Sequence, residues 1–264
     1  MFTMGIDIGS TSSKAAIMED GSKIVASCVI PFGTGTSGPQ RVIEDVLQAA
    51  DMNRDNIDYI VATGYGRRSI PGADEQISEI TCHARGVHFL LPSTRTIIDI
   101  GGQDVKVIRV DENGAVMNFV MNEKCAAGTG RFLEVMARVL ECKVDELSML
   151  SNQAKQAVPI SSTCTVFAES EVISQLAAGN SREDVVAGIH DSVARRVASL
   201  GKRVGLVPDV VMTGGVAQNE GVVKAMRQEL KTEIKTSPLP QLTGAIGAAL
   251  LAYQKVQKAK QAND

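Results

Sequence analysis

The stretch DIGSTSSK, residues 7–14, returns later in the chain as DIGGQDVK, residues 99–106. Asp, Ile, Gly and Lys keep the same offsets in both copies, and each copy lies between two apolar runs that are typical of β-strands. A P-loop requires a following helix and a Gly-Lys-Ser/Thr ending, and a dinucleotide fingerprint requires GxGxxG before a helix, so neither motif fits. The repeat therefore predicts two related strand–turn–strand loops, which we call the first loop (7–14) and the second loop (99–106).

Loops of this kind are suited to holding a polyphosphate from two sides, because glycine allows close backbone approach and successive N–H groups form an anion nest. Asp7 and Asp99, at strand ends, are candidate ligands of Mg²⁺ through water. Asp104 or Gln103 is the candidate catalytic residue that orients an attacking water. The alternative is a pair of similar hairpin turns with no ligand. The residues expected to contact the phosphates are Gly9, Ser10, Thr11, Ser12, Ser13, Lys14, Gly101, Gly102, Gln103 and Asp104.

A third glycine motif follows a late apolar run. The sequence DVVMTGGVAQN, residues 209–219, predicts a buried strand, a diglycine turn and the start of a helix. Such a turn lets a flat ring such as adenine lie against the backbone. The alternative is an ordinary tight turn between strand and helix. The residues expected at the adenosine are Gly214, Gly215, Val216, Ala217 and Gln218.

Apolar periodicity predicts an α/β chain. We expect strands over 3–7, 14–18, 24–30, 57–63, 96–99, 105–110, 116–120 and 210–213. We expect helices over 41–50, 78–90, 127–141, 143–151, 165–179, 181–204, 218–230 and 243–258. Pro92 is the best candidate for a domain boundary. We expect residues 1–92 to form a domain with the first loop and residues 93–264 to form a domain with the second loop. Two arrangements are open for the terminal helix, which packs either on its own domain or back on the first domain.

Composition argues against several classes of protein. The chain has 264 residues, a net charge of −3, no Trp and 3% aromatic residues, so a cationic groove with stacking platforms for nucleic acid is not expected. No apolar run is long enough to span a membrane, and no basic leader opens the chain. We therefore expect a cytoplasmic protein without a nucleic-acid or membrane partner.

The cysteines Cys125 and Cys164 stand out among five because each precedes a run of apolar residues at helical spacing. The odd number of cysteines and the absence of a CxxC pair argue against a disulfide framework and a zinc ribbon. A helix N-terminus lowers the pKa of a thiol, which suits an anionic metal cluster. From the residues alone, buried structural cysteines remain the alternative.

The two loops and the motif at 214–217 together resemble the actin–hexokinase–Hsp70 ATPase superfamily. The resemblance covers nearly the whole chain, with the motifs in the right order. It implies two related α/β domains of ribonuclease H-like fold, with ATP or ADP and Mg²⁺ in the cleft between them.

A narrower resemblance rests on NEKCAAGTGRF (122–132), SSTCTVFAESE (161–171) and TGYGR (63–67), together with GGVAQN at 214–219. These stretches are similar to the activators of 2-hydroxyacyl-CoA dehydratases and the ATPase subunits of benzoyl-CoA reductases. The resemblance implies a homodimer in which Cys125 and Cys164 of both chains hold one [4Fe–4S] cluster. It also implies ATP-dependent transfer of a low-potential electron, received from ferredoxin or flavodoxin, to an iron–sulfur dehydratase component. A dehydratase of 2-hydroxyglutaryl-CoA is the expected target.

Two other functions use the same nucleotide motifs. A small-metabolite kinase of this superfamily is the main alternative, although no sugar or carboxylate pocket is evident in the sequence. An actin-like polymer or nucleotide-dependent scaffold is the other.

Overall fold

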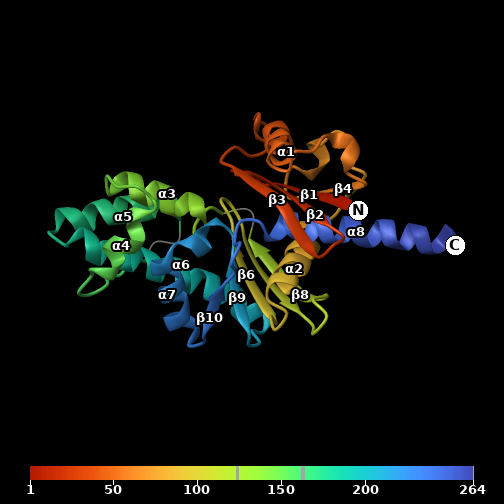
Figure 1. The fold of residues 1–264 in the computed structure, drawn as a ribbon. Helices are drawn as coiled ribbons and strands as arrows, with labels where there is room; N and C mark the ends of the chain where they lie inside the picture. The colour runs from red at the N-terminus through yellow and green to blue at the C-terminus, as the bar shows by residue number, and fades with distance from the viewer. Residues whose placement is uncertain (123–124, 162–163, 264) are drawn as a thin grey trace. The chain divides into compact units, whose positions relative to one another are not determined.

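The computed structural model describes residues 1–122, 125–161 and 164–263. The chain divides into two compact units, which Figure 1 shows as ribbons. Unit 1 comprises Met1–Thr94, Val110–Met117 and Pro238–Asp264, and unit 2 comprises Arg95–Arg109 and Asn118–Ser237. Unit 1 therefore includes two segments, 110–117 and 238–264, that lie beyond the boundary suggested by the sequence at residue 92. The second of them contains the terminal helix, for which packing on the first domain was one of the two expected arrangements.

Unit 1 is built on a five-stranded sheet in the order β3-β2-β1-β4-β5. The central strand β1 is antiparallel to β2 and parallel to β4. The strands are β1 (Phe2–Ile8), β2 (Ser13–Glu19), β3 (Lys23–Ile30), β4 (Tyr59–Thr63) and β5 (Glu75–Gln76). The helices are α1 (Gly38–Ala49), α2 (Glu79–Leu90) and α8 (Thr243–Asn263), with 3-10 turns at Arg54–Asn56 and Arg67–Ser69.

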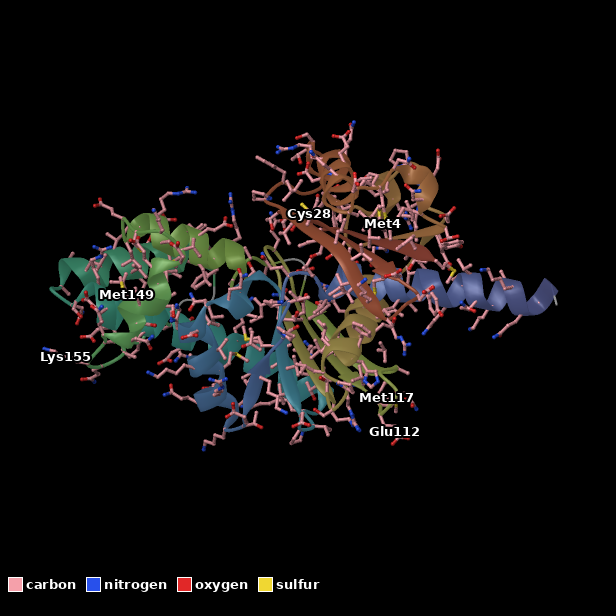
Figure 2. All side chains as sticks on the ribbon, in the orientation of Figure 1. Met4, Cys28, Glu112, Met117, Met149 and Lys155 are labelled. Atoms are coloured by element: carbon pink, nitrogen blue, oxygen red, sulfur yellow. The ribbon has the colours of Figure 1, made fainter. Side chains whose placement is uncertain are left out.

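Alternation along β1 and β2 assigns apolar side chains to the two faces of this sheet. Met4, Ile6 and Ile17 pack with Val42 and Val46 of α1, and Figure 2 shows Met4 and Cys28 on this side. On the opposite face, buried alanines, leucine and isoleucine of α8 pack on Ala16 and Met18. A Cβ at Gly5 would lie within 2.4 Å of the Ala249 nitrogen, so glycine is required where α8 crosses β1.

Unit 2 repeats the same sheet in the order β10-β9-β6-β7-β8. Its strands are β6 (Thr96–Ile100), β7 (Val105–Val110), β8 (Val116–Asn122), β9 (Val210–Thr213) and β10 (Ile234–Thr236). Its helices are α3 (Gly130–Val139), α4 (Glu146–Asn152), α5 (Thr165–Ala177), α6 (Arg182–Val204) and α7 (Glu220–Leu230), with a 3-10 turn at Gly215–Gln218. One apolar cluster joins Ile98, Ile100 and Val107 of the sheet to buried residues of α3, α6 and α7.

The predicted strands and helices are present, with shifted ends. The short strands β5 and β10 are not predicted, because two or three residues carry no measurable alternation. Helix α3 begins at Gly130 and not near 127, since Gly128 has a φ of +86° and Thr129 closes a turn on the carbonyl of Ala126. No helix of the described residues combines the length and apolarity that crossing a bilayer requires.

Candidate functional site

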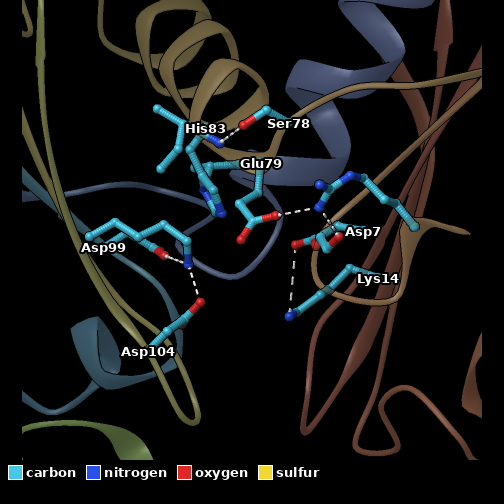
Figure 3. A network of polar contacts seen from close by, with 12 residues as sticks. Asp7, Lys14, Ser78, Glu79, His83, Asp99 and Asp104 are labelled. Carbon is cyan, nitrogen blue, oxygen red and sulfur yellow. Dashed lines mark hydrogen bonds and ion pairs between the residues drawn. The ribbon is translucent and has the colours of Figure 1, made fainter. Parts of the chain in front are cut away.

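The first loop is a tight turn whose two ends are tied together. The amide of Gly9 donates to the carbonyl of Ser12 at 2.9 Å, and Asp7 pairs with Lys14 across the antiparallel ladder. Lys14 Nζ lies 3.8 Å from Oδ2 of the buried Asp7, as Figure 3 shows. The turn therefore presents glycine backbone and one lysine beside a buried carboxylate.

The second loop has the same construction. The amide of Gly101 donates to the carbonyl of Asp104 at 3.0 Å, and Asp99 pairs with Lys106 across the ladder. Here the lysine Nζ lies 3.2 Å from Asp99 Oδ2 and 2.5 Å from Asp104 Oδ2 (Figure 3). Lys106 is buried and bridges both carboxylates, whereas Gln103 at the tip of the turn is exposed.

Not every predicted hydroxyl of the first loop points to a ligand position. The Ser13 hydroxyl donates to the carbonyl of Phe32 at 2.7 Å and is fully buried. Ser10, Thr11 and Ser12 are half-buried. A Cβ at Gly33 would lie 2.4 Å from the Ser10 carbonyl oxygen, so the segment after β3 packs directly on the turn.

A second pair of equivalent residues, one in each unit, was not predicted from the sequence. Thr63 pairs with Asp7 on the parallel side of β1, and Thr213 pairs with Asp99 on the parallel side of β6. Each threonine is followed by a glycine with a φ of +86°, Gly64 and Gly214. A Cβ at Gly64 would lie 2.4 Å from Asp7 Oδ1, and one at Gly214 would lie 2.3 Å from the Ile100 carbonyl and 2.9 Å from Asp99 Oδ1.

The shared signal is therefore Thr-Gly directly after an apolar run, which occurs twice in the sequence. Both glycines let a second backbone segment close on the aspartate of a loop. The TGYGR stretch in unit 1 thus holds the position that the TGGVAQ stretch holds in unit 2.

Polar side chains surround Asp7 in unit 1 (Figure 3). Arg67 Nη1 donates to the Gly64 carbonyl at 2.9 Å and to Glu79 Oε2 at 3.1 Å. His83 is buried with Nδ1 2.9 Å from Thr243 Oγ1. Burial raises the pKa of the neighbouring Cys82 thiol to about 12, so this cysteine is inert at neutral pH.

The predicted adenosine motif forms a 3-10 turn at Gly215–Gln218. Val216 and Ala217 are buried in the core, and Gly215 and Gln218 are exposed. The following helix begins at Glu220 and not at Gln218, because the Asn219 side chain caps it by accepting from Val222 N at 3.1 Å. The exposed surface of this motif is accordingly glycine backbone and the Gln218 side chain.

Helix α3 connects the second loop with the segment that carries Cys125. The amides of Gly130 and Arg131 donate to the carbonyls of Gly101 and Gly102 at 2.9 and 2.8 Å. Two of the N–H groups at the start of a helix, which have no partner within the helix, are thereby satisfied by the loop backbone.

Cys125 is half-buried in a short segment between β8 and α3. Asn122 Nδ2 donates to the Cys125 carbonyl at 3.2 Å, and Arg196 Nη2 of α6 donates to Cys125 Sγ at 3.1 Å. The expectation that a helix follows directly is corrected here, because the turn over 126–129 separates Cys125 from α3. Glu123 and Lys124 of this motif lie outside the described residues.

Cys164 is exposed and occupies the N-cap position of α5. Its carbonyl accepts from Ala168 N at 2.9 Å, so the thiol stands at the positive end of the helix. The amide and the hydroxyl of Ser161 both donate to Glu171 Oε1 at 2.9 Å. Ser162 and Thr163 lie outside the described residues.

Helix α5 exposes apolar side chains beside Cys164. Val166 and Phe167 are 67% and 69% exposed, and Ile173, one of the apolar residues at helical spacing after Cys164, is 52% exposed. Val172 is buried as expected. Exposed apolar side chains gathered on one helix are typical of interaction surfaces.

The donor set of Cys125 and Cys164 fits one half of an iron–sulfur site. A cubane cluster takes four thiolates, and each chain offers two, one with an N–H donor on its sulfur and one at a helix N-terminus. Among the described residues no group of three or more His, Cys, Asp or Glu side chains could hold a metal. For Mg²⁺, Asp7 and Asp99 are each in contact with a lysine, so they suit ligation through water better than direct ligation.

The chain is similar to known proteins over nearly its whole length. The profile of the BadF/BadG/BcrA/BcrD ATPase family matches residues 4–252. The activator of lactoyl-CoA dehydratase from Anaerotignum propionicum is 59% identical over 98% of this chain and 100% of its own length. The (R)-2-hydroxyglutaryl-CoA dehydratase activating ATPase from Acidaminococcus fermentans is 59% identical over 98% of this chain and 99% of its own length.

Solved structures support the same relationship. The activator of the 2-hydroxyisocaproyl-CoA dehydratase from Clostridium difficile, solved with bound ADPNP, is 57% identical and superimposes with a TM-score of 0.95 over 99% of this chain and 97% of its own. A glucokinase of the ROK family from Streptomyces griseus, 13% identical, has a TM-score of 0.58 over 96% of this chain and 100% of its own, which concerns the fold alone. The predicted fold class of two actin- and hexokinase-like α/β domains is confirmed, and the chain belongs to the BadF/BadG/BcrA/BcrD ATPase family, where its similar relatives activate 2-hydroxyacyl-CoA dehydratases.

Proposed function

We propose that the protein is an ATP-driven activator that transfers one electron at a time to the iron–sulfur component of a 2-hydroxyacyl-CoA dehydratase. The observation that carries this proposal is the pair of thiols in unit 2, one of which precedes a helix bonded to the second loop. Relatives at 57–59% identity activate 2-hydroxyacyl-CoA dehydratases, which supports a dehydratase as the partner. Because these relatives serve three different acyl groups, the 2-hydroxyglutaryl-CoA enzyme is one of three targets to be tested.

The nucleotide site is proposed on the paired loops. The amides of Gly9 and Gly101 donate to carbonyls within their own turns. The neighbouring amides of each turn, together with Lys14, would bind the phosphates. Asp7 and Asp99 would hold Mg²⁺ through its waters. The segment from Gly214 to Gln218 would hold the adenosine.

Of the two candidate catalytic residues, Gln103 is the better suited. The Asp104 carboxylate is held by Lys106 at 2.5 Å within the loop, whereas Gln103 is exposed at the tip of the turn. A neutral side chain that orients water is sufficient for phosphoryl transfer, in which positioning and charge stabilisation dominate. Hydrolysis would then give ADP and phosphate, with the water proton passed to solvent.

The electron site is proposed on Cys125 and Cys164. A [4Fe–4S] cluster held there would accept one electron from a ferredoxin or flavodoxin and donate it to the dehydratase component. This chain contributes two thiolates, the Arg196 donor to Cys125, and the N-terminus of α5 at Cys164. Both protein groups place positive charge next to sulfur and would stabilise an anionic cluster.

A homodimer follows from the ligand count. Two thiols per chain provide four only if two copies meet at a twofold axis. The exposed Val166, Phe167 and Ile173 beside Cys164 give that second copy an apolar surface to cover.

The bonds from Gly130 and Arg131 to the second loop provide a physical route from nucleotide to cluster. A change in the carbonyls of Gly101 and Gly102 alters the acceptors at the start of α3, and Cys125 is joined to that helix by a four-residue turn. We expect the reduction potential of the cluster to respond to nucleotide through this route.

The deciding experiment is iron and acid-labile sulfide analysis of protein purified without oxygen. We expect about four iron atoms per two chains, loss of this iron in Cys125→Ala and Cys164→Ala, and unchanged ATP-analogue binding in both. Cys142→Ala is the control, because burial raises the pKa of that thiol and the proposal gives it no role. Wild-type protein that holds no iron but phosphorylates a small metabolite would contradict the proposal and favour the kinase.

Addition of the protein, a reductant and MgATP to inactive lactoyl-, 2-hydroxyisocaproyl- and 2-hydroxyglutaryl-CoA dehydratases then identifies the partner. Activation of none of the three, by protein that carries its cluster, would contradict a role in this group of reactions.

A further inference from the structure

Arg196 makes a contact with Cys125 that neither the motifs nor the proposed cluster ligands account for. Its Nη2 donates to Cys125 Sγ at 3.1 Å, within the range of hydrogen bonds to sulfur. The two residues are far apart in the sequence, and Arg196 comes from the middle of α6. The arginine therefore reaches Cys125 from a different helix.

The structure makes room for this arginine. Gly128 has a φ of +86°, and a Cβ there would lie 3.0 Å from Arg196 Cδ. The aliphatic part of Arg196 thus lies over backbone that has no side chain, and the guanidinium continues to the sulfur. Glycine at 128 serves this close approach as well as the turn before α3.

Helix α6 holds the arginine firmly. The neighbouring Val193, Ala194 and Val197 are each 1% exposed in the core of unit 2. The adjacent Arg195 extends elsewhere, with Nη2 donating to the Ile160 carbonyl at 3.0 Å. The buried side of α6 therefore fixes the backbone from which Arg196 extends toward Gly128 and Cys125.

We infer that Arg196 sets the reduction potential of the cluster by donating a hydrogen bond to the Cys125 thiolate. This inference rests on the proposed function, because it requires Cys125 to be a cluster ligand. A hydrogen bond and a nearby cation both withdraw electron density from sulfur, and both stabilise the reduced, more negative cluster. Arg196 is a positioning and tuning residue, since it acts through Cys125 and not on the iron.

The test is a redox titration of protein purified without oxygen, monitored by absorbance and electron paramagnetic resonance. We expect Arg196→Met to make reduction about tenfold less favourable, a fall of about 59 mV in a one-electron potential. Arg196→Lys keeps the charge but loses the planar fork, and its potential should lie between the two. Arg203→Met is the matched control, because it removes the same charge from an exposed position on the same helix.

Potentials of both Arg196 variants equal to that of Arg203→Met would overturn the inference while leaving the cluster in place. If Arg196→Met folds but binds no iron, the potential of Arg196→Lys decides, and a value equal to wild type overturns the inference. Absence of iron from the wild-type protein would instead overturn the proposed function itself, so the two failures are distinguishable.

Discussion

Lys106 Nζ lies 3.2 Å from Oδ2 of Asp99, and both side chains are almost completely buried. The corresponding pair in the first loop, Lys14 and Asp7, is 3.8 Å apart and its lysine is more exposed. The repeat has therefore preserved the residues but not their environment. In the second loop Asp104 adds a further carboxylate to the same lysine.

Removal of Lys106 should destabilise the protein more than removal of Lys14. Lys106→Met takes away a buried cation that contacts two carboxylates, and we expect a loss of about 3–5 kcal/mol in the free energy of unfolding. Lys14→Met breaks a longer, partly solvated contact and should lose about 1 kcal/mol. Urea denaturation without nucleotide measures both, and equal losses would contradict the asymmetry.

Gly64→Ala should test the role of close backbone approach at Asp7. Its φ of +86° is unfavourable for alanine, and the added Cβ would lie 2.4 Å from Asp7 Oδ1. We expect a loss of about 3 kcal/mol in stability, from backbone strain and overpacking together, and weaker binding of MgATP.

Gly72→Ala is the matched control. Gly72 has a φ of +80° with nothing within 4 Å of the added Cβ, so only the backbone term, about 1 kcal/mol, should appear. Thermal unfolding and nucleotide titration of the two variants separate the effect of backbone strain from the effect of the contact with Asp7. Equal destabilisation would show that contact with Asp7 is unimportant.

The buried His190 should make unit 2 sensitive to acid. Burial lowers the pKa of this imidazole from 6.5 to about 4. Between these values the unfolded chain binds a proton that the folded chain does not. The contribution of His190 to the free energy of unfolding is therefore fully present above pH 6.5 and is lost as the pH falls toward 4. At pH 4.5 the titration of His190 alone should lower the free energy of unfolding by about 2–3 kcal/mol relative to pH 7.

The pH dependence of unfolding in wild type and His190→Gln measures this contribution. The variant should be less stable at pH 7, because its packing is altered, but its stability should decline less between pH 7 and 4.5. Parallel curves would exclude His190 as the cause.

Phe167→Asp should prevent the association of two chains without unfolding either one. Phe167 is 69% exposed on α5 beside Cys164, so a charge there is tolerated in the single chain but not in a buried interface. Sedimentation of protein purified without oxygen should show an iron-containing dimer for wild type and an iron-free monomer for the variant. Met149→Asp, at an exposed position on α4 that Figure 2 labels, is the control and should remain dimeric.

The duplicated loops, the glycine motif at 214 and the two cysteines are evident from the sequence, because they depend on residue types at fixed offsets. Helical spacing likewise identifies the buried face of α3, where Phe132, Leu133 and Met136 are at most 2% exposed. Ile173 has the same kind of spacing in α5 but is exposed. Periodicity identifies an apolar face, but it does not say whether this chain or another one covers it.

The sequence by itself determined the order of the helices and of all strands except β5 and β10, the strand–turn–strand form of both loops and the family of the chain, because local periodicity and motif spacing are properties of neighbouring residues. Only the tertiary structure decided that Thr63 and Thr213 are equivalent, that Lys106 bridges two carboxylates, and that Arg196 contacts Cys125. The first and the last of these relationships join segments far apart in the sequence, whereas the contacts of Lys106 are local and depend on how deeply the β6–β7 hairpin is buried. All three therefore depend on how sheets and helices pack.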